Sequence, residues 1–419
     1  MSANTPFFTI AKGCRICGGK IESIYNLGNL ASSGSFPASK LENVPVGPLE
    51  IGKCLNCGLT QLCHDFDKSV LYTDKYGYRS GINETMVTHL TNLATDILEV
   101  LIELPDKDKT FIDIGSNDGT FLKQIKKINQ GPIRLIGVDP STSDFKDEYH
   151  AAGMELITEL FDLNLANGKL GGVKADVITS IAMFYDLEDP VGFAEGISKL
   201  LKPEGFWVLE QSYLPTMIEN NAFDTICHEH LEYYTLNDIK NVCEKVGLRV
   251  FKVEFNSSNG ASFRSYVCHQ NSRIHETENL VSSTLEAELQ YVKDRKRLDE
   301  FFLGISEIRI CVLETLGKIK DEGKSIHGYG ASTKGNTLLQ YFNIDENFIP
   351  FIAERNPMKF GKFTPGTLIP IISENQSREL SPDYYFVLPW HFKNAILKRE
   401  LEINSKRKFI FPFPRLEII

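Results

Sequence analysis

Four cysteines in two pairs have the spacing of a zinc site. Cys14 and Cys17 form one Cys-x-x-Cys pair, and Cys54 and Cys57 form a second. Two such pairs supply four thiolates, which complete the tetrahedral shell that Zn²⁺ prefers in structural sites. A complete shell leaves no open position for water, so we expect a structural rather than a catalytic metal. A pair of metal-free turns is the alternative.

A second set of residues suits a nucleotide-type cofactor. Residues 113–119 read Asp-Ile-Gly-Ser-Asn-Asp-Gly after an apolar run, and the next apolar run ends at Asp139. At the carboxyl end of a parallel sheet, glycines let a ligand approach the backbone, and a terminal acid accepts hydrogen bonds from ribose hydroxyls. The segment lacks the Gly-x-Gly-x-x-Gly pattern that seats a pyrophosphate, which favours a cofactor without phosphate, and S-adenosylmethionine fits. A plain turn is the alternative. The predicted cofactor-binding residues are Asp113, Gly115, Asn117, Asp118, Asp139 and Ser180.

Residues 223–234 concentrate groups that can exchange protons. This stretch holds two histidines, three acids and two tyrosines. Histidine suits a general base because its ordinary pKa lies near neutrality. Consecutive side chains of an extended segment point to opposite sides, so His228, Glu229 and His230 would not converge on one metal. We therefore favour an acid–base pocket over a metal site, with a solvated polar loop as the alternative.

A further glycine turn lies in the C-terminal part of the chain. Residues 328–334 read Gly-Tyr-Gly-Ala-Ser-Thr-Lys after a short apolar run. Glycines followed by a lysine at the end of a strand suit an anionic diphosphate. Gly330, Lys334 and His391 are therefore the predicted substrate-binding residues. The alternative is a pseudo-Rossmann domain that has lost its ligand.

The elements that must position these residues alternate between strands and helices. Apolar residues recur at helical spacing over 85–104, and a second helix is expected from about Thr120. Residues 249–255 and 262–268 suggest a closing antiparallel hairpin, and the charged, proline-free stretch 280–322 suggests helices. The alternation predicts a mostly parallel sheet in each α/β unit. The other predicted strands are 110–114, 134–139, 175–180, 206–211, 324–330, 348–353 and 384–388.

Composition excludes several classes of function. The formal net charge of -10 opposes a surface that binds a phosphate backbone, which needs clustered lysine and arginine. Residues 1–12 lack a basic flank before a long apolar run, and no stretch approaches the ~18 apolar residues of a membrane span. We expect a cytoplasmic protein without a nucleic-acid or membrane partner.

Taken in this order, the motifs resemble those of the sugar C-methyltransferases of deoxysugar biosynthesis, which act on nucleotide-linked keto sugars. The resemblance implies an α/β fold with a class I methyltransferase core of Rossmann-like topology. A zinc-binding module would occupy 1–75, the S-adenosylmethionine-dependent core 76–275, a helical spacer 276–322, and a second Rossmann-like domain, which helps to bind the nucleotide-sugar, 323–419. A monomer and a dimer both remain open. The segments that carry the resemblance are the four cysteines, 76–80, 114–119, 223–225, 228–231, 328–331, 334–339 and 365–370.

The resemblance also implies roles for individual residues. His230 would be the base, with Glu229, Tyr76 and Tyr78 in the same pocket. On chemical grounds, Glu229 is expected to orient an imidazole, and His228 or one of these tyrosines to donate to the developing oxyanion. The implied reaction is deprotonation to an enolate followed by C-methylation, at C3 of a 4-keto-6-deoxyhexose.

Two departures from the family's pattern bear on the substrate. Cys227 stands where related enzymes carry a tyrosine, and residues 180–186 read Ser-Ile-Ala-Met-Phe-Tyr-Asp in place of Asn-Asn-Val-x-Ala-His. Asp186 or Tyr185 then falls at the position of the missing histidine. These departures leave the methylated carbon and the sugar open. The alternatives are a methyltransferase for another small molecule or for nucleic acid, and a non-catalytic binding protein with a vestigial core.

Overall fold

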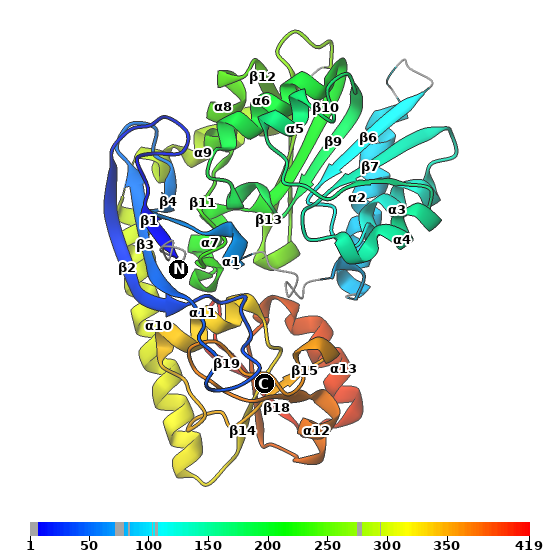
Figure 1. Cartoon of the computed structure of the whole chain (residues 1–419). Coiled ribbons are helices and arrows are strands. Elements are labelled where there is room, and N and C mark those ends of the chain that lie inside the picture. Colours follow the sequence, from blue (N-terminus) through cyan, green and yellow to red (C-terminus); the bar gives the residue numbers. More distant parts are fainter. Residues whose placement is uncertain are drawn as a thin grey trace, which may run out of the picture.

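The described residues form four sheets, namely a small two-stranded sheet and three larger ones in the N-terminal, central and C-terminal parts of the molecule (Figure 1). The computed structural model describes residues 7–71, 79–82, 84–102, 104, 108–274, 279–293 and 295–419. An N-terminal sheet lies beside the long helix α10 (Lys296–Asp321), the central α/β unit lies above, and the C-terminal α/β unit lies below in this view. No helix among these residues has the length and apolar character needed to cross a membrane.

The N-terminal sheet includes a strand from the central part of the chain. Its order is β11-β4-β3-β2, formed by β2 (Ile21–Ala31), β3 (Val46–Cys54), β4 (Thr60–Leu62) and β11 (Glu232–Tyr233). A small second sheet pairs β1 (Phe8–Ile10) with β5 (His64–Phe66), and α1 (Lys68–Leu71) follows. Because β11 begins two residues after His230, its pairing with β4 attaches the predicted base segment to the zinc module.

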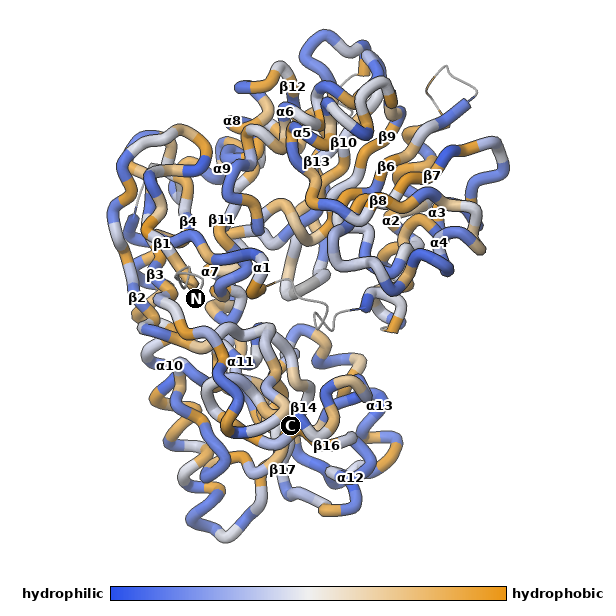
Figure 2. The backbone as a smooth tube through the Cα atoms, in the orientation of Figure 1, coloured by the Kyte–Doolittle hydropathy of each residue, from blue (hydrophilic) through white to orange (hydrophobic). Residues whose placement is uncertain are grey.

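The central sheet has the order β12-β13-β10-β9-β6-β7-β8. The strands from β10 to β8 run parallel, and β13 lies antiparallel between β10 and β12, which confirms the predicted closing hairpin. Figure 2 shows hydrophobic residues concentrated in these strands, as expected for a sheet covered on both faces. The strands are β6 (Lys109–Ile114), β7 (Ile133–Val138), β8 (Glu155–Ile157), β9 (Ala175–Ile181), β10 (Leu201–Ser212), β12 (Leu248–Asn256) and β13 (Ser262–His269).

Helices cover both faces of this sheet. One face packs against α2 (Glu84–Ile102) and α3 (Thr120–Ile128), through Leu93, Ile97, Leu122 and their neighbours. The opposite face packs against a second group of helices. That second group includes α5 (Leu163–Asn167), α6 (Pro190–Leu200) and α8 (Leu236–Lys245). The remaining helices of this unit are the short α4 (Lys146–Ala151) and α7 (Leu214–Glu219).

The C-terminal sheet has the order β16-β15-β14-β17-β18-β19, parallel except for the last pair. Helix α10 contributes buried residues to the same hydrophobic core, so it is part of this unit's packing as well as its connection. The strands are β14 (Ile326–Tyr329), β15 (Ile352–Glu354), β16 (Ile371–Ser373), β17 (Tyr384–Val387), β18 (Lys408–Phe411) and β19 (Glu417–Ile418). The other helices are α9 (Leu280–Lys293), α11 (Thr333–Phe342), α12 (Glu374–Glu379) and α13 (Lys393–Ile403).

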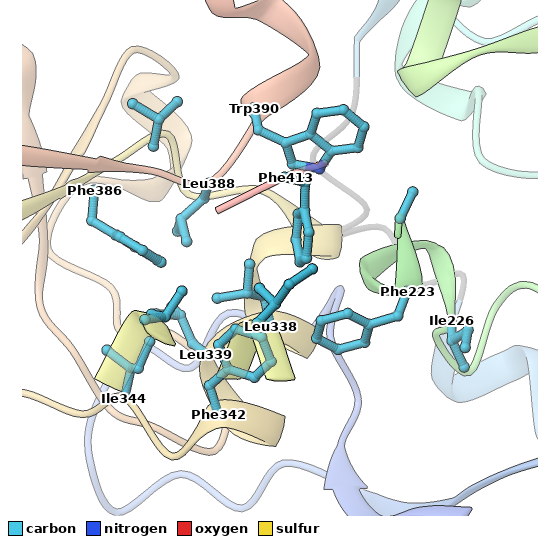
Figure 3. Close-up of a cluster of buried hydrophobic side chains, with 14 of the residues drawn as sticks. Phe223, Ile226, Leu338, Leu339, Phe342, Ile344, Phe386, Leu388, Trp390 and Phe413 are labelled. Carbon is cyan, nitrogen blue, oxygen red and sulfur yellow. The ribbon is translucent and has the colours of Figure 1, made fainter. Parts of the chain in front are cut away.

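An aromatic cluster joins the central and C-terminal units (Figure 3). Phe223, fully buried just before the predicted base segment, stacks on Phe342 of α11 with ring centroids 5.3 Å apart. Its ring also meets Phe413 edge-on at 5.6 Å. Burying one such side chain contributes roughly 1.5–3 kcal/mol. The cluster therefore fixes the segment that begins at Phe223 against the C-terminal end of α11.

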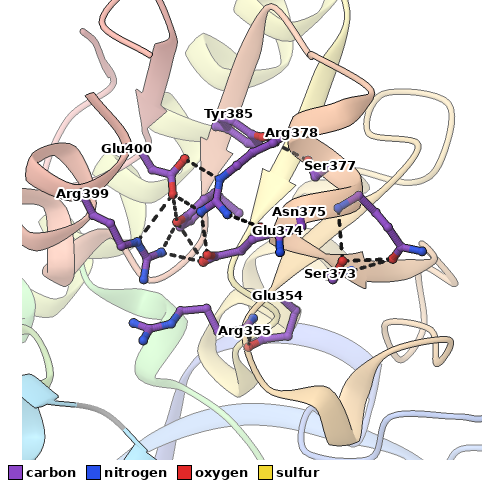
Figure 4. A network of polar contacts seen from close by, with 12 residues as sticks. Glu354, Arg355, Ser373, Glu374, Asn375, Ser377, Arg378, Tyr385, Arg399 and Glu400 are labelled. Atoms are coloured by element: carbon purple, nitrogen blue, oxygen red, sulfur yellow. Dashed lines mark hydrogen bonds and ion pairs between the residues drawn. The ribbon is translucent and has the colours of Figure 1, made fainter. Parts of the chain in front are cut away.

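A buried carboxylate, Glu400, anchors α13 to the C-terminal sheet (Figure 4). It accepts hydrogen bonds from Tyr329 Oη at 2.9 Å and from Arg407 Nη1 at 2.8 Å, and it pairs with Arg378 at 2.5 Å. Burial raises the pKa of Glu400, but the hydrogen bonds from Arg378 and Tyr329 and the charge of Arg378 lower it by more. The net direction is downward, so the folded state favours the carboxylate.

We expect Glu400→Gln to lower the free energy of unfolding by about 3 kcal/mol at pH 7, because the arginines lose their buried counter-charge. A carboxyl with a lowered folded pKa stabilises above its unfolded value of roughly 4.3 and loses this contribution as pH falls through the folded value. Urea unfolding of both proteins should therefore show a difference that is constant from pH 7 to about pH 5 and that shrinks below about pH 4, as the pH falls through the folded pKa of Glu400. The exposed Glu379→Gln is the control, and a difference independent of pH would contradict the ionic explanation.

Candidate functional site

One cavity of about 330 Å³ receives residues from both α/β units. Gly115 and Asp139 line one end, at the carboxyl ends of β6 and β7. Glu229, His230 and Lys334 line the other. The predicted cofactor turn and the predicted acid–base segment therefore share one space.

The cofactor end is built by a backbone turn and a terminal acid. Gly115 has φ of +75°, and a Cβ there would lie 3.0 Å from Met183 Cγ, so glycine is required on both counts. Asp139 accepts hydrogen bonds from the backbone N–H groups of Asn117 at 2.9 Å and Ser141 at 2.8 Å. A carboxylate held in this way still has lone pairs for ribose hydroxyls.

Asp113 adds a buried acid beneath the turn. Its carboxyl accepts a hydrogen bond from Thr179 Oγ1 at 2.6 Å. Burial raises the pKa of Asp113 to about 7, the Thr179 hydrogen bond opposes this, and the nearby charge of Asp139 adds to it. A bound cation would favour the ionised form of both acids. Asp113, Gly115, Asn117 and Asp139 therefore fit S-adenosylmethionine, whose sulfonium is cationic and whose ribose needs an acceptor.

Two other predicted cofactor residues lie outside the cavity lining. Asp118 accepts hydrogen bonds from the backbone N–H groups of Gly81 at 2.9 Å and Thr120 at 3.2 Å, so it holds the segment that carries Ser80 into the cavity. Ser180 is fully buried and accepts a hydrogen bond from Trp207 Nε1 at 2.9 Å. Both side chains are turned to neighbouring protein groups, which gives them positioning roles here.

We expect Asp139→Ala to raise the Kd for S-adenosylmethionine about 10- to 100-fold, because charge-assisted hydrogen bonds contribute about 1.5–3 kcal/mol each. Isothermal titration at pH 7 would measure this. The exposed Asp147→Ala, on α4, changes the net charge equally and should bind the cofactor like the wild type. Equal Kd values for the two variants would remove Asp139 from the cofactor site.

His230 has the geometry of a general base. Its Nδ1 lies 2.7 Å from the carbonyl oxygen of Thr225, which can only accept, so Nδ1 carries the proton and Nε2 presents its lone pair. The Tyr185 ring meets the imidazole edge-on with centroids 4.4 Å apart. Burial, followed by the positive charge of Lys334, lowers the pKa of His230 to about 3. The imidazole is therefore neutral at pH 7, as a base must be.

Glu229 lies in the same cavity but does not orient the imidazole. A tight turn, in which the His230 N–H donates to the Cys227 carbonyl at 3.1 Å, brings Glu229 and His230 to the cavity together. Glu229 Oε2 accepts a hydrogen bond from Ser33 Oγ at 3.4 Å, and Oε1 is buried without a hydrogen-bond partner among the described residues. Burial raises the pKa of Glu229. The predicted orienting role is wrong, since the Thr225 carbonyl holds Nδ1.

His228 points away from the cavity, into the zinc module. Its Nε2 lies 3.2 Å from the carbonyl oxygen of Gly47, and the Phe66 ring meets it edge-on at 4.8 Å. The side chain is fully buried, and burial lowers its pKa to about 4. The turn at 228–229 separates it from its neighbours, so the structure does not bring His228 to the reacting groups.

The predicted substrate residues divide in a similar way. Lys334, in the first turn of α11, lines the cavity, and so does Asp186. His391 lies close enough to Lys334 for the charge of the lysine to act on it. Burial, followed by this charge, lowers the pKa of His391 to about 3. Gly330 lies outside the cavity lining, with φ of +82° and a Cβ position only 2.6 Å from Pro389 Cγ. The predicted Tyr76 and Tyr78 fall outside the described residues.

The sequence analysis assigned no site role to three residues that lie near the cavity. The buried Asp224 accepts a hydrogen bond from Trp390 Nε1 at 2.9 Å and so ties the base segment to the C-terminal unit. Glu210 lines the cavity and pairs with His89 Nε2 at 2.5 Å. Its place at the end of β10 was a usable signal, since acids there face the ligand side of a parallel sheet. No sequence signal marked the Thr225 carbonyl.

The four cysteines come together in the N-terminal module. Their Sγ atoms all lie within 4.8 Å of one another, with Cys14–Cys57 at 3.4 Å and Cys17–Cys54 at 3.5 Å. The backbone N–H groups of Asn56 and Cys57 point to Cys54 Sγ at 3.4 and 3.5 Å. Four converging thiols with backbone donors fit tetrahedral Zn²⁺, which the four thiolates would hold in a closed structural site.

The strand order, the glycine turn after β6 and the acid after β7 define a class I, S-adenosylmethionine-dependent methyltransferase. Comparisons with known proteins agree with this class. Three family models match successive parts of the chain: a zinc binding domain over 14–72, a methyltransferase domain over 86–253, and a C-methyltransferase C-terminal domain over 257–414. C-methyltransferase NovU of Streptomyces niveus is 29% identical over 413 residues, which cover 97% of this chain and 96% of that protein.

Two further similarities cover a smaller part of the chain. A tRNA U34 carboxymethyltransferase of Campylobacter jejuni (strain RM1221) is 26% identical over 157 residues, 35% of this chain and 51% of that protein. The crystal structure of CurJ carbon methyltransferase matches with 15% identity and a TM-score of 0.38, over 49% of this chain and 62% of that one. The three successive matches and the similarity to NovU over most of both chains support an S-adenosylmethionine-dependent C-methyltransferase with a structural zinc.

Proposed function

We propose that this C-methyltransferase acts on a nucleotide-linked keto-deoxysugar, at C3 of a 4-keto-6-deoxyhexose. One observation carries the proposal: a single cavity presents the cofactor turn at Gly115, the base His230 and the cation Lys334. A neutral base beside a methyl donor suits a carbon acid, and a lysine in the first turn of a helix suits a diphosphate. The motif resemblance to sugar C-methyltransferases supports the same substrate class.

The chemistry required of the chain is removal of a proton from carbon. A neighbouring ketone acidifies the C3–H bond, and Nε2 of His230 takes that proton while the bonding electrons form an enolate. Bound S-adenosylmethionine supplies the activated methyl group that the nucleophilic carbon acquires. The Thr225 carbonyl stabilises the imidazolium that forms, because it accepts the Nδ1 proton.

Glu229 is the residue we assign to the enolate oxygen. Burial raises the pKa of Glu229 and so shifts the carboxyl toward its protonated form, which can donate a hydrogen bond. Its buried Oε1 has no hydrogen-bond partner among the described residues. Asp186, which lines the same cavity, is assigned to a sugar hydroxyl. Tyr76 and Tyr78 remain candidates for the same pocket.

Incubation with methyl-labelled S-adenosylmethionine and a panel of nucleotide-linked 4-keto-6-deoxy sugars tests the proposal. We expect the label in one product, with its mass raised by one methyl group and NMR placing it on C3. Solvent deuterium should enter C3 without the cofactor if deprotonation precedes transfer. Bulk tRNA belongs in the panel, because the core resembles a tRNA-modifying enzyme. Label in RNA and in no sugar would contradict the proposal.

A further inference from the structure

We infer that the diphosphate of the substrate activates the base: an anion bound at Lys334 offsets the positive charge that this lysine places beside His230, and the imidazole becomes a stronger base. The inference rests on the proposed function and specifies how the site selects its substrate class. A keto sugar without the diphosphate would bind beside a weak base and exchange its proton slowly. Selection would then occur at the chemical step as well as in binding.

Packing fixes the two residues relative to each other. Lys334 stands in the first turn of α11, where Ser332 Oγ accepts the Gly335 N–H at 3.0 Å and caps the helix. His230 follows the short segment that begins at Phe223. The ring of Phe223 stacks on the ring of Phe342 of α11, with centroids 5.3 Å apart. The Asp224–Trp390 hydrogen bond closes the same junction. The short helix Phe223–Thr225 therefore packs on α11, and His230 and Lys334 line the same cavity.

The charged and titratable groups around this pair come from several elements. The short helix Phe223–Thr225 supplies Asp224, and the turn after it supplies Cys227 and Glu229. The helix Phe184–Asp186 supplies Asp186, and the helix Trp390–Phe392 supplies His391. Asp224 reduces the effect of the lysine but is itself buried, and burial raises its pKa. Lys68 of α1 also lines the cavity, but Lys334 is the cation whose charge acts on the pKa of His230.

The electrostatic effect has a definite sign. Burial is the larger cause of the low pKa of His230, and the Lys334 charge is the second. An anion at Lys334 removes the second cause, so the pKa of His230 rises toward neutrality. A higher pKa means a stronger base for as long as it stays below the working pH. By linkage, protonation of His230 must strengthen anion binding by the same factor.

Proton uptake on binding tests the coupling directly. The probe is thymidine diphosphoglucose, which has no ketone to react and whose phosphate diesters do not titrate between pH 5.5 and 8. Isothermal titration of the full chain, in buffers of different ionisation enthalpy, reports the protons taken up. We expect uptake that increases as pH falls toward 5.5, together with binding that tightens once the pH falls below the raised pKa of His230.

Variants assign the proton and the charge. His230→Asn should abolish the uptake. Lys334→Met should weaken binding of the probe and move the uptake to higher pH, because the pKa of His230 is then higher before the anion binds. Lys334→Arg should keep the wild-type pH dependence, because the charge is kept. The surface Lys393→Met is the control for net charge and should behave like the wild type. Binding without proton uptake, or uptake that survives in His230→Asn, overturns the inference alone. Absence of any binding overturns it together with the proposed substrate class.

Discussion

His230→Ala is expected to lower turnover by about 10²- to 10⁴-fold, the usual loss when a general base is removed. The Kd for S-adenosylmethionine should change by less than about threefold, because the hydrogen bonds that hold Asp139 do not involve the imidazole and contributions from separate sites are nearly additive. Steady-state rates with the best sugar of the panel and isothermal titration with the cofactor measure the two quantities. Solvent deuterium exchange at C3 should fall in proportion to turnover.

The surface His150→Ala, on α4, is the matched control and should keep wild-type rates. A second variant tests whether the backbone of Thr225, rather than its side chain, orients His230. Thr225→Val keeps the carbonyl that accepts the Nδ1 proton, so it should retain most activity. Near-wild-type turnover in His230→Ala would remove this residue from proton transfer, and exchange that persists after turnover is lost would assign deprotonation to another group.

The parts of the site that could be predicted from the sequence are those whose residues lie close together along the chain or at the ends of predicted strands. Residues 113–119 follow a buried strand, and a terminal acid at Asp139 faces the same sheet edge whatever the rest of the fold does. The structure accordingly places Asp113, Gly115, Asn117 and Asp139 in one cavity. The cysteine pairs are local in the same sense, because each turn fixes two thiols and only the approach of the turns is tertiary.

The contacts that sequence could not predict depend on chain segments that meet in space. Ser180 was assigned to the cofactor because it lies near the end of a strand. In the structure its hydroxyl accepts a hydrogen bond from Trp207 on the neighbouring strand. Alternation in an extended chain separated His228 from Glu229, but a turn replaced the extended chain and left Glu229 and His230 together. Lys334 met the base segment only because an aromatic cluster closes the junction. Such outcomes follow from packing, which periodicity does not encode.

The strands of the N-terminal module could not be predicted from the sequence, because their pairing is irregular. β2 and β3 pair over most of their length, but the register shifts between Ser23 and Tyr25 and again between Asn26 and Asn29. Each shift interrupts the alternation of apolar and polar residues on which strand prediction relies. The fourth strand, β11, lies more than 160 residues further along the chain than its partner β4. A module assigned from cysteine spacing is therefore completed by the segment that carries the base.

That shared sheet gives Cys54→Ser consequences beyond the metal. We expect the variant to lose most of its zinc and at least about 3 kcal/mol of stability, because metal-binding energy in such modules is coupled to folding. Cys54 ends β3, and β3 pairs with β4, which pairs with the strand after His230. Loosening this sheet should therefore reduce turnover as well, while binding of S-adenosylmethionine to the separate turn at Gly115 is kept. Zinc content by emission spectrometry, thermal unfolding and the labelled-methyl assay measure the three effects.

The exposed Cys311→Ser is the matched control, because it removes a thiol that lies outside the four-sulfur cluster. Chelation of the wild-type protein should reproduce the Cys54→Ser phenotype, and added Zn²⁺ should restore the chelated protein but not the variant, which has three of the four thiolates. A stable, zinc-free and active Cys54→Ser protein would contradict the structural-metal assignment. Loss of turnover with unchanged cofactor binding would instead show that the metal acts at a distance, by holding the strand that positions His230.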